Sequence, residues 1–192
     1  MPLRVSFDLA DDDLKHFKLI MQEARQAADR FSAEEIIDGA HRLLSEVRTA
    51  KVPSFIRDRL ESLQTMIEMV TDDEWQLPAD EVSHVINALA YFAEAEDLIP
   101  DHIPGLGFLD DAIMVELVVR ELKHEIDAYR DFCTFRAEEE SRRKSQGASD
   151  LVTREEWLAT RRAQLHSRMR RRRRSERRQR GGPKRSSPFS LF

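Results

Sequence analysis

Apolar residues recur every three or four positions along most of the first 140 residues, and no other feature constrains the fold as strongly. Such stripes begin near Leu14, Ile36, Ile56, Val82 and Val115. This spacing gathers the apolar side chains on one face of a helix. Because no single helix can bury its own stripe, the sequence predicts an all-α fold, a compact helical bundle of about five helices.

Local signals predict where several of these helices begin and end. Ser32 and Glu35 have the spacing of a capping box at the start of the second helix. Pro53 and Pro78 stand where the third and fourth helices are expected to begin. We expect the fourth helix to run to about residue 96, and one long fifth helix to run from Leu109 to about residue 140.

Charge is divided unevenly between the two ends of the chain. Residues 1–140 contain 14 Lys and Arg against 32 Asp and Glu, a net charge of −18, whereas residues 141–192 contain 17 against 4, a net charge of +13. We therefore expect an acidic helical domain over residues 1–140 and a basic C-terminal arm. An asymmetry of this size suggests that the arm meets a polyanion.

The arm is predicted to be partly helical and partly disordered. Residues 141–152 are typical of a linker, and Thr153 and Glu156 repeat the capping-box spacing. We expect a basic, marginal helix over residues 153–180 that frays where the arginines of residues 170–174 repel one another. Residues 181–192 have the composition of a disordered tail.

Arginine dominates residues 168–180, with nine arginines in thirteen residues. Guanidinium groups match phosphate oxygens, and clustered cations gain from counterion release. No aromatic residue interrupts the run, so we expect sequence-independent contact with the phosphates of RNA or DNA. Masking of the arm by the acidic domain and binding to anionic lipid are the alternatives. The residues predicted to bind nucleic acid are Arg168, Arg170, Arg171, Arg172, Arg173, Arg174, Arg177, Arg178, Arg180, Lys184 and Arg185.

The chain ends in an apolar peptide, Pro-Phe-Ser-Leu-Phe, at the end of a polar tail. It resembles the peptide by which bacterial proteins enter the pocket of the replicative sliding clamp, commonly Gln-Leu-Ser-Leu-Phe. The last three residues match, whereas Pro188 replaces the usual glutamine. We expect Phe189, Leu191 and Phe192 to be the anchors if a protein partner, such as a sliding clamp, is docked.

A loop containing prolines, glycines and aspartates is predicted between the fourth and fifth helices. Its motif consists of an aromatic residue, then Asp-Leu-Ile-Pro-Asp, Ile-Pro, a glycine and a paired Asp-Asp, with Asp97, Pro100, Asp101, Pro104, Gly107, Asp110 and Asp111 as its marked positions. Over about residues 85–125 this segment resembles the YkvA-like domain family. The resemblance implies two helices joined by this loop and no established activity. Many relatives look membrane-associated, which implies a peripheral membrane adaptor as an alternative function.

Two interpretations of this loop stay open. In the first, it is a structural corner in which Asp110 or Asp111 caps the fifth helix. In the second, the carboxylates of Asp97, Asp101, Asp110 and Asp111 bind Mg²⁺ or Ca²⁺, although their spacing is not that of an EF-hand. Whether the loop binds a metal is left unknown.

Few residues indicate catalysis. No nucleophile, dinucleotide or zinc motif is present, and we expect Glu121, His124 and Glu125 to be solvated neighbours on one helix. A single cysteine, Cys133, excludes an internal disulfide and favours a cytoplasmic, reducing location. The sequence thus predicts a non-enzymatic accessory protein with no cofactor, which binds nucleic acid. A peripheral membrane adaptor and a metal-dependent activity at the loop are the alternatives.

Overall fold

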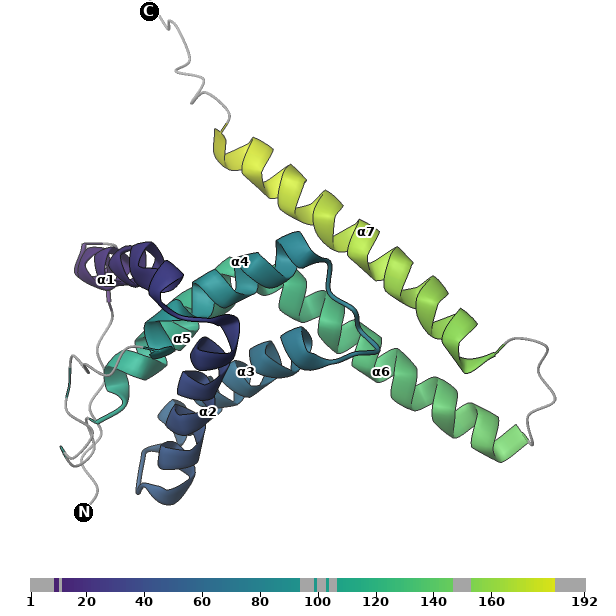
Figure 1. Cartoon of the computed structure of the whole chain (residues 1–192), viewed down its shortest axis with the longest axis horizontal. Helices are drawn as coiled ribbons and strands as arrows, with labels where there is room; N and C mark the ends of the chain where they lie inside the picture. The colour runs from purple at the N-terminus through teal and green to yellow at the C-terminus, as the bar shows by residue number, and fades with distance from the viewer. Residues whose placement is uncertain are drawn as a thin grey trace, which may run out of the picture. The chain divides into compact units, whose positions relative to one another are not determined.

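Seven α-helices and two 3-10 helices make up the ordered elements of the computed structural model, which describes residues 9–10, 12–93, 99, 103, 107–146 and 153–181 (Figure 1). They are α1 (Asp13–Ala27), η1 (Ala28–Arg30), α2 (Ala33–Thr49), α3 (Ser54–Thr71), α4 (Ala79–Leu89), η2 (Ala90–Ala93), α5 (Leu109–Glu121), α6 (Lys123–Gln146) and α7 (Arg154–Gly181). No strand occurs among the described residues, which confirms the predicted all-α fold.

The chain divides into two compact units, an N-terminal unit of residues 1–126 and a C-terminal unit of residues 127–192. The division falls inside α6 and not at the predicted boundary near residue 140. The end of the predicted domain, residues 127–140, therefore groups with the basic arm.

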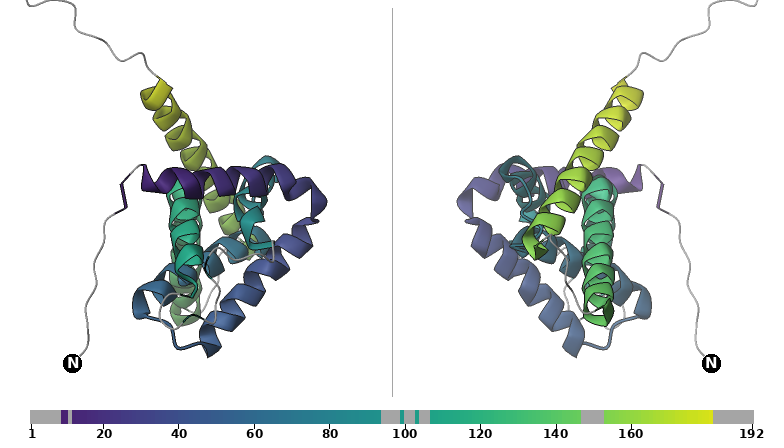
Figure 2. Two further views of the ribbon diagram at one scale, coloured as in Figure 1. Left: turned by 90° about the vertical axis from the view of Figure 1, so that its left-hand side faces the viewer. Right: turned by 90° about the vertical axis from the view of Figure 1, so that its right-hand side faces the viewer.

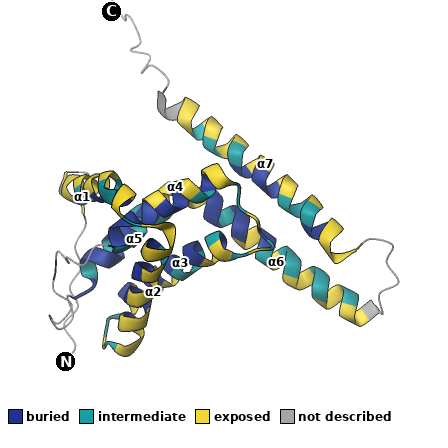
Figure 3. Ribbon diagram, in the orientation of Figure 1, coloured by how far each residue is buried: buried dark blue, intermediate teal, exposed yellow. Residues whose placement is uncertain are grey.

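In the N-terminal unit, α2 packs against α3, α4 and η2, while α5 packs against α3 and α1. Figure 2 shows α1 crossing α5 and α2 running back from the end of α1. The predicted stripes face inward, as the buried bands of Figure 3 show. The completely or almost completely buried side chains of this unit include Ile36, Ile56, Leu60, Leu63, Met66, Ile67, Leu89 and Met114.

A close approach of backbones joins α2 to η2 at Gly39. A Cβ atom built on Gly39 would lie 2.9 Å from both the Cα of Ala93 and the carbonyl carbon of Phe92, and would clash with the carbonyl oxygen of Phe92. A glycine is therefore required here because the backbone of η2 occupies the space of a side chain.

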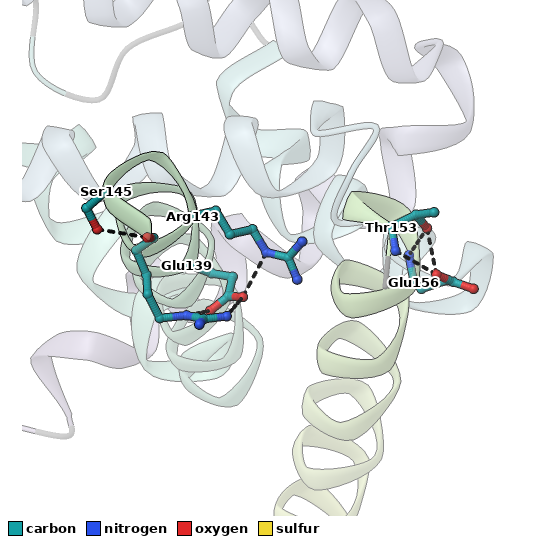
Figure 4. Close-up of polar contacts among 6 residues, drawn as sticks. Glu139, Arg143, Ser145, Thr153 and Glu156 are labelled. Carbon is teal, nitrogen blue, oxygen red and sulfur yellow. Dashed lines mark hydrogen bonds and ion pairs between the residues drawn. The ribbon is translucent and has the colours of Figure 1, made fainter. Parts of the chain in front are cut away.

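The predicted capping boxes are both present. In α2, Ser32 N–H donates to Glu35 Oε2 at 2.7 Å and Glu35 N–H donates to Ser32 Oγ at 3.2 Å. At the start of α7, Thr153 N–H donates to Glu156 Oε2 at 2.7 Å and Glu156 N–H donates to Thr153 Oγ1 at 3.3 Å, as Figure 4 shows. These local signals placed the two helix starts correctly.

Other predicted helix ends are wrong. The single fifth helix is two helices that meet at Leu122, whose backbone angles (φ −91°, ψ 17°) leave the α-helical range. The fourth α-helix ends at Leu89 and is followed by the 3-10 turn η2, and the residues after Ala93 up to the predicted end near residue 96 lie outside the described residues. Part of the predicted linker is helical, because α6 extends to Gln146.

The predicted fraying at residues 170–174 is also wrong, because α7 continues through them to Gly181. Arginine has a high helix propensity, and its long side chains spread their charges into solvent. Of the predicted disordered tail, residues 181–192, Gly181 is the last residue of α7, and residues 182–192 lie outside the described residues, with Lys184, Arg185, Phe189, Leu191 and Phe192 among them.

Candidate functional site

The arginines of α7 are largely turned to solvent. Arg168, Arg171, Arg172, Arg174, Arg177 and Arg178 are exposed, and Arg170 and Arg173 are half-buried. Arg180 belongs to the helix, but its side chain lies outside the described part of the structure. All the predicted arginines of the arm up to residue 180 therefore lie on one helix.

These arginines share a broad face of α7. At about 100° per residue, Arg171, Arg174 and Arg178 project in neighbouring directions, with Arg168 beside them, whereas Arg172 projects at the edge of the apolar stripe. Leu158, Leu165 and Met169 lie on the opposite side of the helix and are buried. The helix α7 therefore has a thin apolar stripe on one side and a wide basic face on the other.

The arginines are spaced about as closely as the charges of a nucleic acid. Eight arginines lie between Arg168 and Arg178. At a rise of about 1.5 Å per residue, these positions span roughly 15 Å, or about one guanidinium group every 2 Å. Duplex DNA carries one phosphate charge per about 1.7 Å of its axis, so the linear charge densities of the two are similar.

Within the C-terminal unit, α7 is paired with the second part of α6 by charged and aromatic side chains. Arg154 Nη2 lies 2.6 Å from Glu140 Oε1, and Arg168 Nη1 lies 3.5 Å from Asp131 Oδ2. Residue numbers rise along one helix as they fall along the other, so the two segments run antiparallel. They form a helical hairpin, called the basic hairpin below.

Aromatic rings and guanidinium groups add further contacts between the two helices of the hairpin. Phe135 and Trp157 meet edge to face with ring centroids 5.6 Å apart. The guanidinium carbon of Arg143 lies 5.3 Å from the centre of the Trp157 ring, and that of Arg161 lies 5.0 Å from the centre of Phe135. Through these cation–π contacts, Arg143 and Arg161 stabilise the hairpin itself.

Not every basic residue of the hairpin is available to a ligand. Glu139 pairs with Arg142 at a shortest distance of 2.6 Å. It also pairs with Arg143 at 2.9 Å, as Figure 4 shows. Hydrogen bonds from these two arginines lower the pKa of Glu139 to about 2. In contrast, no ion pair is found within the described residues for Arg171, Arg174 or Arg178, which leaves their charges for an external partner.

A buried histidine lies beneath the basic face. His166 is 6% exposed, and burial together with the charges of Arg170 and Arg162 lowers its pKa from 6.5 to about 4. The imidazole is therefore neutral at physiological pH. It supports the helix as a packed residue and adds no charge to the arginine face.

The predicted capping role of the paired aspartates is wrong. Phe108, with a left-handed backbone (φ 65°), stands at the N-cap of α5, and its side chain cannot accept a hydrogen bond. Asp110 is buried inside the first turn, where its Oδ2 accepts a hydrogen bond from the N–H of Ile99 at 3.0 Å. Asp110 therefore ties the loop to α5, and Asp111 is buried beside it.

The predicted metal ligands of this loop are only partly placed. Asp97 and Asp101 lie outside the described residues, and so do Pro100 and Pro104. Gly107 is described and buried at the end of the loop. Among the described residues, the loop carboxylates form no group with the spacing of a metal site.

A different cluster, which sequence reasoning missed, joins α4 to the start of α6. One ligand atom from each of Glu81, His84 and Glu125 lies within 4.8 Å of the others. Glu81 and Glu125 are completely buried. The expectation that Glu125 is solvated is therefore wrong. The sequence signal that could have revealed part of this cluster is the three-residue spacing of Glu81 and His84, which puts both side chains on one face of a helix.

Glu121 extends this cluster toward the surface. His84 Nε2 lies 3.4 Å from Glu121 Oε1, and Arg25 Nη2 donates to Glu121 Oε2 at 2.6 Å. The contact with His84, followed by that with Arg25, lowers the pKa of Glu121 to about 2. Arg25, Glu121 and His84 thus form a chain of polar contacts that leads from the surface to the buried carboxylates.

Comparison with known proteins gives one match. A family model described as a protein of unknown function (DUF1232) matches residues 85–117. The match begins within α4 and ends within α5, so it includes the loop with the paired aspartates. Searches of curated proteins and of solved structures found no match.

The match supports the resemblance at the helix–loop–helix segment and does not extend to the rest of the chain. The YkvA-like name is a related one for this family, and no function comes with it. None of the helices in the described ranges is long and apolar enough to cross a membrane.

Proposed function

We propose that the protein is a non-enzymatic accessory protein that binds RNA or DNA through the arginine face of α7. The observation that carries this proposal is the row of exposed arginines on one continuous helix, Arg168 to Arg178, at about the charge density of a nucleic acid. A continuous helix holds these charges in fixed positions, so less conformational entropy is lost on binding than with a flexible tail.

The chemistry of this face favours phosphate contact over base recognition. Arginine forks bind phosphate oxygens in a bidentate manner. The aromatic rings of the basic hairpin, Phe135 and Trp157, pack against each other and against arginines, so they are engaged within the hairpin. Binding that depends on phosphates alone depends strongly on salt and little on sequence.

The acidic N-terminal unit gives the protein a way to limit this binding. Residues 1–126 contain 12 Lys and Arg against 27 Asp and Glu, a net charge of −15, and they repel the same polyanion that the arm attracts. Contact with nucleic acid is therefore confined to the arm. A protein partner that docks on Phe189, Leu191 and Phe192, a sliding clamp being the specific candidate, would bring a second function to the same arm.

The test measures the affinity of the full-length protein for a fluorescent duplex as a function of salt. With about 5 to 8 phosphates neutralised, the slope of log K against log salt should lie between roughly −5 and −7. The triple substitution Arg171→Gln, Arg174→Gln and Arg178→Gln should make the slope shallower by about 3, at about 0.9 per lost contact. Glutamine keeps the helix propensity, so circular dichroism should be unchanged.

A matched control separates local contact from total charge. Arg42, Arg48 and Arg57 are exposed arginines of the N-terminal unit, and their replacement by glutamine removes the same three charges. The control protein should keep the wild-type slope. Equal loss in both triple variants would show that net charge, and not the face of α7, governs binding, and the proposal would then be rejected. Binding to anionic vesicles but not to duplex or single-stranded RNA would favour the membrane adaptor.

A further inference from the structure

We propose that Glu81, His84 and Glu125 form a binding site for one divalent transition metal ion, with Zn²⁺ as the best match. This site lies wholly within the N-terminal unit and is independent of the arginine face. It is the one group of metal-ligating side chains that meets in the described part of the chain.

The three side chains are already gathered at close to ligand spacing. Glu81 and His84 lie one turn apart on α4, and Glu125 comes from the first turn of α6. Their ligand atoms lie within 4.8 Å of one another. In a tetrahedral zinc site with bonds of about 2.1 Å, ligand atoms are separated by about 3.4 Å. Small rotations of the side chains therefore bring all three to one ion.

Charge is the first reason to expect a cation. Both Glu81 and Glu125 are completely buried and offer oxygen atoms to the same small cluster, so a cation bound between them would offset the repulsion of two neighbouring carboxylates. A divalent ion balances both carboxylates and leaves the imidazole neutral, as a metal ligand must be.

The orientation of His84 is the second and independent reason. Its Nδ1 is buried, faces Glu125 Oε1 at 3.8 Å and has no hydrogen-bond partner among the described residues. Its Nε2 faces the carboxylate of Glu121 at 3.4 Å, and that carboxylate is held by Arg25. Metal-bound histidines usually donate their second N–H to a carboxylate in this way, which fixes the ring and directs the other nitrogen at the ion.

The ligand set decides the class of metal. One imidazole nitrogen and two carboxylate oxygens suit zinc and neighbouring transition ions. Calcium takes six to eight oxygen ligands, and Mg²⁺ prefers oxygens and water. The side chain of His84 is 29% exposed, which gives an ion a path from solvent and leaves room for water to complete the coordination.

The test uses the full-length protein after treatment with a chelator. Addition of Zn²⁺ at about 100 times its Kd should raise the melting temperature by about 5–10 °C. Ca²⁺ and Mg²⁺ at the same concentration should cause no rise. Co²⁺ should bind with a stoichiometry of one per chain and give the visible absorption of a nitrogen- and oxygen-ligated ion.

Three substitutions test the proposed ligands, and two substitutions at exposed positions serve as controls. His84→Asn, Glu81→Gln and Glu125→Gln should each abolish the thermal shift and the Co²⁺ spectrum. His41→Asn and Glu34→Gln, at exposed positions of the same unit, should leave both unchanged. Because His84 is partly exposed, its variant should fold even if a buried variant does not. A Zn²⁺ shift that survives His84→Asn, or a wild-type protein without any shift, would overturn the proposal.

Discussion

Replacing His166 with glutamine should remove a specific part of the acid sensitivity of the basic hairpin. In the folded chain the pKa of His166 lies near 4, whereas in the unfolded chain it returns to about 6.5. Because the folded pKa is depressed, the stabilising contribution is complete above pH 6.5 and is lost as the pH falls toward 4. Between these values the unfolded chain binds a proton that the folded chain does not.

The magnitude follows from the difference between the two pKa values. At pH 5 protonation of the unfolded chain lowers the free energy of unfolding by about 2 kcal/mol, and at pH 4 or below by up to about 3 kcal/mol. For a chain of this size, 2 kcal/mol corresponds to roughly 4–8 °C in melting temperature. Glutamine has no proton to gain, and it keeps a polar group of similar size in the buried position.

The assay is urea unfolding of wild type and His166→Gln at pH 8 and at pH 5, followed by far-ultraviolet circular dichroism. Other carboxylates titrate in both proteins, so the quantity of interest is the difference between the two losses of stability. Wild type should lose about 2 kcal/mol more than the variant between pH 8 and pH 5. Parallel losses in the two proteins would refute the assignment of a depressed pKa to His166.

Three further changes test packing, the loop and the tail. Gly39→Ala places a methyl group where the backbone of η2 lies. The free energy of unfolding, measured by thermal denaturation, should therefore fall by about 1–3 kcal/mol, although alanine has a higher helix propensity than glycine. Asp110→Ala removes the acceptor of the Ile99 N–H and should cost about 1–3 kcal/mol in urea unfolding; an unchanged midpoint would show that the bond is dispensable. Leu191→Ala combined with Phe192→Ala changes no charge, so duplex affinity should be unchanged, whereas any binding to a purified sliding clamp should be lost.

Local sequence patterns determined where most of the helices lie. The boxes at Ser32 and Thr153 are formed within three residues, so their hydrogen bonds depend on nothing distant. The apolar stripes of α2 and α3 predicted their buried faces for the same reason, since helical geometry fixes which residues share a side. The separation of an acidic N-terminal part from a basic C-terminal part was also determined by the sequence alone, because it depends only on where the charged residues stand along the chain.

Tertiary structure alone decided the features that depend on residues far apart in the chain. The break at Leu122 between α5 and α6 is one such feature, because no local signal marks it. Asp110 bonds to Ile99, eleven residues earlier, and so does not cap its own helix. Glu125 has the sequence context of a surface residue, yet α4 covers it with Glu81 and His84. Helical periodicity specifies a face of each helix, but only the tertiary structure decides which faces meet and which charges, such as those of Glu81 and Glu125, are removed from water.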